Sequence, residues 1–321
     1  MKKKRLTRKM AEKILSFEFL LDPDLGDLSV FTSIDNDAAK ALCKFKGTSL
    51  PLNGVTNLSA EVAGKLRWVR SESLSLSGLI SLADGVADEL SKFKGQSLSL
   101  NGVTSLSNAA AEALIKFEGY SLSVESLTNL SEETAGDVSK SKMKKIEFDA
   151  LDGLSDAVAE RLSQFPGDSL TITVRSLSGS EAESLSKFKG EELTFDVIRS
   201  VTAEAADGLS KFKGRHLELR SGNDGLILSD EAMASLSRFT GRSLLFAGLM
   251  CLSEIAAENL SRFQGCELWL GGLKEIWEEI HLSDAAAESL SKFEGDLWLN
   301  LNGIPESAQC ILRKHPSFTN W

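Results

Sequence analysis

The sequence repeats itself with a period of about 24 residues along nearly its whole length, and this period limits the folds open to the chain. An L-x-L pattern or a near variant recurs every 22 to 29 residues. A unit of that size is too short to bury its own apolar face, so each unit must stack on its neighbours. The period therefore predicts one elongated domain, although 321 residues alone would suggest two. The repeats begin at Leu28, Leu50, Leu74, Leu98, Leu122, Ile146, Leu170, Leu193, Leu217, Leu244, Leu268 and Leu297.

Within each unit the apolar periodicity changes from two to about 3.6 residues. Leu98-Ser-Leu100-Asn alternates apolar and polar residues, as a strand with one buried face does. Ala110, Leu114 and Phe117 then fall on one face of a helix that begins after Ser107. The unit is therefore predicted to run strand, loop, helix and turn.

Polar residues and glycines mark the expected helix ends. A side-chain acceptor suited to an N-cap occurs at Ser59, Ser107, Ser131, Ser155, Thr202, Ser229, Ser253 and Ser283. Glycines suited to a left-handed position after the helix occur at Gly47, Gly95, Gly119, Gly167, Gly190, Gly214, Gly241, Gly265 and Gly295.

These units resemble the leucine-rich repeat family, most closely its cysteine-containing class with its L-T-x-L-S-D loop. The stretch Leu98-Ser-Leu100-Asn-Gly-Val103-Thr-Ser-Leu106-Ser carries the resemblance, which extends from Leu28 to about Trp321. In the close similarity between its units, the chain also resembles expanded bacterial repeat families of unassigned role. The resemblance implies an α/β solenoid of about 12 strand-loop-helix units, mostly 24 residues long. In such a solenoid a parallel sheet forms one face and helices form the other.

The sequence departs from this family at one loop position. Where Asn or Cys normally closes a buried hydrogen-bond ladder, the chain has Val55, Leu79, Val103, Leu127, Leu151, Ile198, Leu249 and Leu273. The loop backbone groups must then bond to other partners, such as neighbouring backbone or water.

A parallel β-helix is the competing fold, since it also stacks L-x-L strands. The Ala-Ala-x-x-Leu-x-x-Phe segment argues against it, because a β-helix turn has no helical arm. In the leucine-rich interpretation, a ladder of buried rings forms from Phe45, Phe93, Phe117, Phe165, Phe188, Phe212, Phe239, Phe263 and Phe293. The lysines beside these rings are expected on the outside: Lys92, Lys94, Lys187, Lys189, Lys211, Lys213 and Lys292.

The formal charge of −10 is unevenly distributed. Residues 1–9 hold six Lys and Arg, so the remainder has 30 basic against 46 acidic side chains. Such a body repels nucleic acid, and we expect no nucleic-acid partner. No run of 18 apolar residues occurs, and the charged start does not resemble a signal peptide. We therefore expect no membrane association, and a cytoplasmic location is favoured.

The sequence shows little catalytic chemistry. Cys43, Cys251, Cys266 and Cys310 form no C-x-x-C pair, so neither a zinc site nor a disulfide framework is indicated. His216, His281 and His315 stand in different units without a paired acid or thiol at a repeated offset. We expect neither an enzyme nor a bound metal or cofactor.

The sheet face is the remaining candidate for a binding site. The second and fourth residues of each strand should be exposed on it. The middle of this face is predicted to be acidic, through Glu147, Asp149, Asp196 and Glu218, with Arg220 among them. The C-terminal third carries an aromatic strip of Leu245, Trp269 and Trp298, beside small Ala247 and Gly271. Exposed apolar residues in a row usually mark a contact site. A loop insertion adds Trp277 and His281 as secondary candidates.

The sequence thus predicts a non-catalytic interaction scaffold that binds a protein partner, with a basic segment favoured by the acidic face, or a glycan. The alternative is a structural or self-associating protein, whose aromatic strip is a homodimer seam or a contact with its own C-terminal cap. We expect an N-terminal cap with a basic tip over residues 1–27, the solenoid over 28–304 and a C-terminal cap over 305–321.

Overall fold

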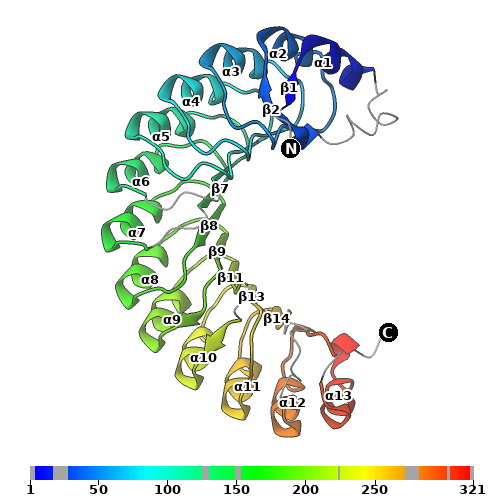
Figure 1. Cartoon of the computed structure of the whole chain (residues 1–321). Helices are drawn as coiled ribbons and strands as arrows, with labels where there is room; N and C mark the ends of the chain where they lie inside the picture. Colours follow the sequence, from blue (N-terminus) through cyan, green and yellow to red (C-terminus); the bar gives the residue numbers. More distant parts are fainter. Residues whose placement is uncertain are drawn as a thin grey trace. The chain divides into compact units, whose positions relative to one another are not determined.

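The computed structural model describes residues 4–16, 28–124, 130–148, 153–222, 225–271, 282–301 and 304–318. It contains two compact units, Met1–Leu151 and Asp152–Trp321, which we call unit 1 and unit 2. In each unit, successive repeats add a parallel strand to a sheet and a helix to the layer beside it (Figure 1). The α/β solenoid of strand-loop-helix repeats is therefore confirmed.

In unit 1 the leucines of the L-x-L pattern lie side by side. Leu50 pairs with Leu74, Leu98 follows, and Leu122 pairs with Ile146 at the far end. The sheet strands are β3 (Ser49–Pro51), β4 (Ser73–Ser75), β5 (Ser97–Ser99), β6 (Ser121–Val124) and β7 (Lys145–Phe148). The helices are α1 (Arg8–Leu15), α2 (Asn36–Leu42), α3 (Ala60–Leu66), α4 (Asp84–Leu90), α5 (Asn108–Ile115) and α6 (Glu132–Val138).

The prediction that a repeat strand starts at Leu28 is wrong. Leu28–Val30 forms a 3-10 turn (η2), and the following strand β2 (Phe31–Ile34) pairs with β1 (Lys4–Leu6) in a separate two-stranded sheet. The reason is the register within the repeat: Leu28 lies seven residues before the N-cap Asp35, as Leu52 does before Ser59. Leu28 therefore matches the last leucine of a repeat strand, not its first.

Unit 2 continues the same arrangement with longer central strands. The order of its main sheet is β8 (Ser169–Thr173), β9 (Glu192–Asp196), β11 (His216–Arg220), β13 (Ser243–Ala247), β14 (Glu267–Trp269) and β15 (Asp296–Trp298). A second small sheet pairs β10 (Ser200–Val201) with β12 (Ile227–Leu228). The helices are α7 (Asp156–Leu162), α8 (Gly179–Leu185), α9 (Ala203–Ser210), α10 (Asp230–Leu236), α11 (Glu254–Ser261), α12 (Asp284–Leu290) and α13 (Glu306–Leu312), and a 3-10 turn η3 spans Pro316–Phe318.

All eight predicted N-caps are confirmed, since each side chain accepts a hydrogen bond from the backbone three residues on. Asp35 and Ser178 cap α2 and α8 in the same way. These contacts satisfy amide groups that a helix start otherwise leaves without partners.

Neighbouring backbone replaces the missing Asn or Cys ladder in the loops. In unit 1 the amide of Thr56 donates to the carbonyl of Thr32 at 3.1 Å, and Thr104 donates to Ile80 at 3.1 Å. In unit 2 the same kind of bond joins Arg199 to Arg175, Ile227 to Arg199 and Met250 to Leu226, at 2.9–3.0 Å. The prediction that the loop backbone groups bond to neighbouring backbone is therefore confirmed.

The predicted phenylalanine ladder forms the centre of unit 2. From Phe165 to Phe293, successive rings stack with centroids 6.1–6.3 Å apart and planes within 13° of parallel. His315 occupies the next position and stacks on Phe293 at 6.4 Å. Its Nδ1 accepts from the amide of Ser317, so its Nε2 donates to the carbonyl of Phe293 at 2.8 Å. The histidine thus ends the ladder with both ring nitrogens bonded.

The prediction that the repeat glycines adopt a left-handed backbone conformation is wrong. The helices end at a right-handed residue such as Ser186, and positive φ among the glycines occurs only at Gly225 and Gly248 in the described part of the chain. Steric fit explains the repeat glycines instead. A Cβ at Gly214 would overlap the ring of Phe212 and lie 2.6 Å from the carbonyl oxygen of Gly190.

The sequence shows the same coupling between the ladder ring and the glycine. Each of the nine ladder phenylalanines is followed two residues later by glycine, and the three repeats without the ring also lack the glycine. Those three carry the pairs Val69 and Ser71, Ser141 and Met143, and His315 and Ser317. A smaller or differently placed ring therefore leaves room for a side chain at the second position.

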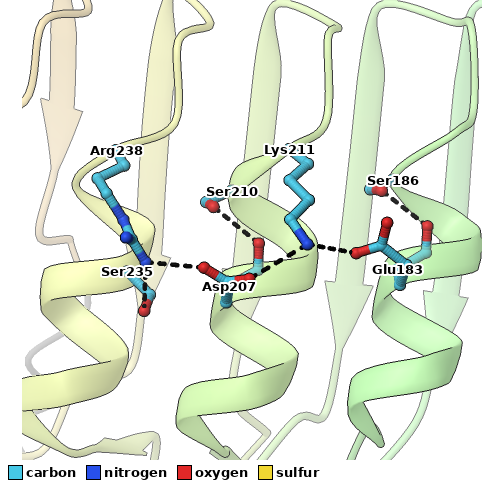
Figure 2. A network of polar contacts seen from close by, with 7 residues as sticks. All are labelled: Glu183, Ser186, Asp207, Ser210, Lys211, Ser235 and Arg238. Carbon is cyan, nitrogen blue, oxygen red and sulfur yellow. Dashed lines mark hydrogen bonds and ion pairs between the residues drawn. The ribbon is translucent and has the colours of Figure 1, made fainter.

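On the outer layer of unit 2, charged side chains link neighbouring helices (Figure 2). Lys211 lies between Glu183, at 2.6 Å, and Asp207, at 3.2 Å, and Arg238 bonds to Asp207 at 2.8 Å. The hydrogen bond to Glu183, followed by that to Asp207, raises the pKa of Lys211. Hydroxyls of Ser186 and Ser210 donate to helix carbonyls beside this network. The lysines flanking the ladder are exposed, as predicted.

Replacing Gly214 by alanine tests the steric coupling. Gly214→Ala should destabilise the protein by about 2 kcal/mol, because the new Cβ overpacks the ring of Phe212. Adding Phe212→Val to a Gly214→Ser change, which copies Val69 and Ser71, should cost less than the two single changes together by about 1 kcal/mol or more. Urea unfolding of Gly214→Ala measures the first effect, and urea unfolding of the unmodified protein, Gly214→Ser, Phe212→Val and their double variant measures the coupling. Gly271→Ala, where a Cβ meets nothing within 4 Å, is the control. Simple additivity would contradict the explanation.

Candidate functional site

The aromatic strip forms as predicted at the C-terminal end of the sheet in unit 2. Leu245 of β13 pairs with Trp269 of β14, which pairs with Trp298 of β15. The two indole rings stack with centroids 4.5 Å apart and planes 11° from parallel. Trp298 remains 45% exposed and Leu245 and Trp269 are half-buried. A pair of stacked rings with one accessible edge is a rigid apolar surface.

Small residues beside the tryptophans leave an open slot. Ala247 follows Leu245 by two residues and lies on the same face of β13, and Gly271 follows Trp269 by two, in the turn after β14. Among the described residues, a Cβ added at Gly271 would meet nothing within 4 Å, and Gly271 has no left-handed φ. In that part of the chain neither packing nor backbone conformation requires glycine here, and we call the space above it the slot.

A hollow of about 610 Å³ adjoins the strip at the outer edge of β15. Its wall includes Trp298, Leu299, Leu301, Phe318 and Arg313. The tail closes part of this edge, because Ser317 Oγ accepts a hydrogen bond from the amide of Leu297 at 2.9 Å. The described part of the predicted C-terminal cap thus contacts the backbone of β15 and leaves the Trp298 side chain exposed.

The acidic part of the face differs from the prediction. Glu218 is only 8% exposed, and both of its oxygens accept hydrogen bonds from Arg220, at 2.6 and 2.7 Å. Asp196 lies 3.7 Å from the same guanidinium. The hydrogen bond to Glu218 is the main cause of the raised pKa of Arg220. These carboxylates are therefore largely neutralised within the chain.

The predicted exposure of every second strand position is wrong, and some of the predicted site residues lie outside the described part of the chain. Thr171 and Thr194 occupy second strand positions but are 4% and 1% exposed, because neighbouring side chains about 4.8 Å away cover them. In unit 1, Glu147 is paired with Lys145 at 2.9 Å. Asp149, Trp277 and His281 lie outside the described residues.

Sequence reasoning missed Glu267, which supports the strand that carries Trp269. Its carboxylate accepts hydrogen bonds from Ser243 Oγ at 2.5 Å and from Arg242 at 2.9 Å. The Ser243 bond, followed by the Arg242 bond, lowers the pKa of Glu267. The available signal was the spacing of two residues between Glu267 and Trp269, which places both on one face.

Other chemistry is sparse in the described part of the chain. There, no group of three or more His, Cys, Asp or Glu side chains is placed to hold a metal ion. His315 is committed to the end of the phenylalanine ladder. The four cysteines form no disulfide, and burial raises the pKa of the Cys43 thiol. Within the same described ranges, every helix is too short or too polar to cross a membrane.

Comparison with known proteins gives only distant similarities. No family model matches this chain, and no curated protein matches it. A chain of the Toll–Spatzle complex of Drosophila is 13% identical, with a TM-score of 0.46, over 92% of this chain and 42% of that chain. A chain of the Rad7–Elc1 complex of yeast is 16% identical, with a TM-score of 0.44, over 94% and 91%. A chain of the TLR13–ssRNA13 complex is 18% identical, with a TM-score of 0.44, over 83% and 44%.

The chain therefore spans less than half the length of the Toll and TLR13 chains that it matches. At these identities and TM-scores the likeness supports no statement about function.

Removing Arg220 tests the internal pairing of the acidic face. Arg220→Met should destabilise the protein by about 2 kcal/mol, because Glu218 is left nearly buried without its partner. The double change Glu218→Gln and Arg220→Met should recover most of that loss. Chemical unfolding measures both. If Arg220→Met unfolds like the unmodified protein, the pair does not hold the face together.

Acidification tests the role of Glu267. A carboxyl pKa lowered by folding stabilises the protein above its unfolded value of about 4.3, and this contribution is lost as the pH falls through the folded pKa. Glu267→Gln should therefore be less stable than the unmodified protein at pH ~7 and lose less stability between pH ~5 and ~3. Unfolding midpoints at the two ends of this range measure the difference. Glu191→Gln, at an exposed carboxylate 3.8 Å from Arg215, is the matched control and should not change the slope.

Proposed function

We propose that this protein is a non-catalytic scaffold that binds a protein partner on the sheet face of unit 2, at the aromatic strip and the slot above Gly271. The observation that supports this most directly is a stacked tryptophan pair, of which Trp298 is exposed and Trp269 half-buried, with the slot above Gly271 beside it. Rigid aromatic side chains next to a cleft are typical of the residues that dominate binding energy at interfaces. An apolar or aromatic side chain of the partner fits this slot.

The contact is apolar at its centre, and the acidic residues contribute less than their number suggests. Glu218 and Asp196 already interact with Arg220, so a basic partner segment would have to compete with an internal cation. Electrostatic attraction then affects the rate of association more than the stability of the complex. Partner choice therefore depends on the fit to Trp269, Trp298 and the slot.

The alternative is that the strip joins two copies of this chain. An exposed tryptophan at the outer edge of a sheet suits a symmetric dimer as well as a foreign partner. A dimer seam predicts a concentration-dependent mass, whereas a recognition surface predicts a monomer that binds another protein. Light scattering over a range of concentrations separates the two functions.

Filling the slot tests the proposal without removing the aromatic residues. Gly271→Leu should leave stability within about 0.5 kcal/mol, because a Cβ there meets nothing within 4 Å among the described residues, and should lower partner capture at least about 10-fold. The matched control is Gly153→Leu, at the other glycine of unit 2 whose Cβ would meet nothing within 4 Å among those described. Capture from a lysate, with mass spectrometry of the bound proteins, compares these variants with Trp269→Ser/Trp298→Ser. A partner retained equally by Gly271→Leu and the unmodified protein would show that the slot is not the binding site.

A further inference from the structure

The net charge of the chain belongs entirely to one unit. Residues 1–151 carry 20 Lys and Arg against 20 Asp and Glu, whereas residues 152–321 carry 16 against 26. The expectation that an acidic body repels nucleic acid therefore applies to unit 2 and not to unit 1. Screening at physiological salt limits such repulsion to about 8 Å, so the local charge of a surface decides what it binds.

Unit 1 carries exposed cations on three consecutive turns that lead from helix to strand. We call Lys44, Lys46, Trp68, Arg70 and Lys94 the turn-edge patch; all five are exposed. They occupy matching positions beside the ladder residue of three consecutive repeats. In the described part of the chain, none of the four cations forms an ion pair. The other lysines of these turns differ, since Lys92 is bonded to Asp88 and Glu89.

Trp68 is the feature that makes this patch unlike the other turns. The matching position holds Lys, Arg or Gln in the other repeats, for example Lys44, Lys92 and Gln164. Trp68 is 58% exposed, and the guanidinium of Arg67 lies 5.2 Å from the centre of its ring. A large aromatic ring at a solvent-exposed turn contributes nothing to the buried ladder.

A hollow of about 470 Å³ lies beside Trp68, at the turn of the repeat that lacks the ladder ring. Val69 replaces phenylalanine, and the hollow is bounded by Trp68, Arg70, Lys94 and Gln96. Ser71 also lines it, and its hydroxyl is buried without a hydrogen-bond partner. Glu72 is the carboxylate in its wall, and Glu89 is bonded to Arg67 at 2.8 Å. The hollow thus combines an aromatic wall, two unpaired cations and an exposed amide.

We propose that the turn-edge patch binds single-stranded nucleic acid. Proteins that bind single strands pair a row of cations, which follows the phosphates, with aromatic side chains on which bases stack. Here a base stacks on Trp68 in the hollow, the amide of Gln96 faces the base edge, and phosphates contact Lys44, Lys46, Arg70 and Lys94. Tyr120, which is 52% exposed in a nearby repeat, offers a second stacking surface. This site is separate from the aromatic strip of the proposed function.

Two other polyanions fit less well. An anionic membrane surface requires a band of apolar side chains that enters the lipid boundary. The exposed large apolar residues of unit 1, among those described, are only Trp68, Ile80 and Tyr120. An acidic peptide would satisfy the cations but would leave the indole of Trp68 and the hollow beside it without a flat ligand.

Fluorescence anisotropy of a labelled oligonucleotide of about ten nucleotides tests the proposal on the full chain. The reversal Arg70→Glu/Lys94→Glu should weaken binding at least about 10-fold and reduce the salt slope by about two. The matched control is Lys189→Glu/Lys213→Glu, which reverses the same repeat positions in two consecutive repeats of unit 2 and should change binding less than about 2-fold. Trp269→Ser/Trp298→Ser should also leave it unchanged, which separates this site from the aromatic strip.

Trp68→Lys distinguishes stacking from simple charge, because it installs the lysine that other repeats carry. Nucleic-acid stacking predicts roughly 10-fold weaker binding despite the added cation, at unchanged unfolding midpoint. Stronger binding by Trp68→Lys would overturn the proposal, as would no binding by the unmodified protein or equal loss in both charge reversals. Equal or tighter binding to polyglutamate, or to vesicles of phosphatidylcholine and phosphatidylserine, would assign the patch to an acidic peptide or a membrane and would also overturn it.

Discussion

The fit between each phenylalanine ring and the glycine two residues later is the contact on which the stacking of the repeats depends. The ring fills the space between strand and helix, and the glycine lets it lie against the carbonyl of the preceding repeat. Neither residue can change alone without overlap or a cavity. In the repeats that contain both residues, the strand of the main sheet begins one or two residues after this glycine.

The two candidate surfaces arise from opposite states of that ladder. In unit 2 the rings run unbroken from Phe165 to His315, and the regular register brings Trp269 and Trp298 into a stack. In unit 1 the ladder is interrupted at Val69, and a hollow lies beside Trp68 at this turn. Regular repeats thus present side chains in rows on the sheet, whereas the irregular repeat differs in its turn, where Trp68 takes the place of Lys, Arg or Gln.

The sequence was sufficient for the features that periodicity controls. The paired leucines, the serine N-caps, the ring ladder and the stacked tryptophans all follow from residue spacing. Prediction from the sequence failed where a single residue satisfies two requirements. Gly214 resembles a helix C-cap by position, but its φ is not positive, and glycine is required there because a Cβ would overlap the ring of Phe212. Glu218 occupies an exposed position in the pattern, but Arg220 on the same strand covers and neutralises it.

Charge shows most clearly why composition cannot replace position. A total of −10 predicts repulsion of polyanions, yet unit 1 is neutral, and four exposed cations of its turns form no ion pair with the described residues. In unit 2 the carboxylates outnumber the cations, yet those at the centre of the sheet are bonded to arginine. Over a screening length of about 8 Å, a ligand responds to the pairing of the nearest side chains and not to their sum. Paired acids beside the aromatic strip and unpaired cations beside Trp68 therefore suit the two surfaces to different ligands.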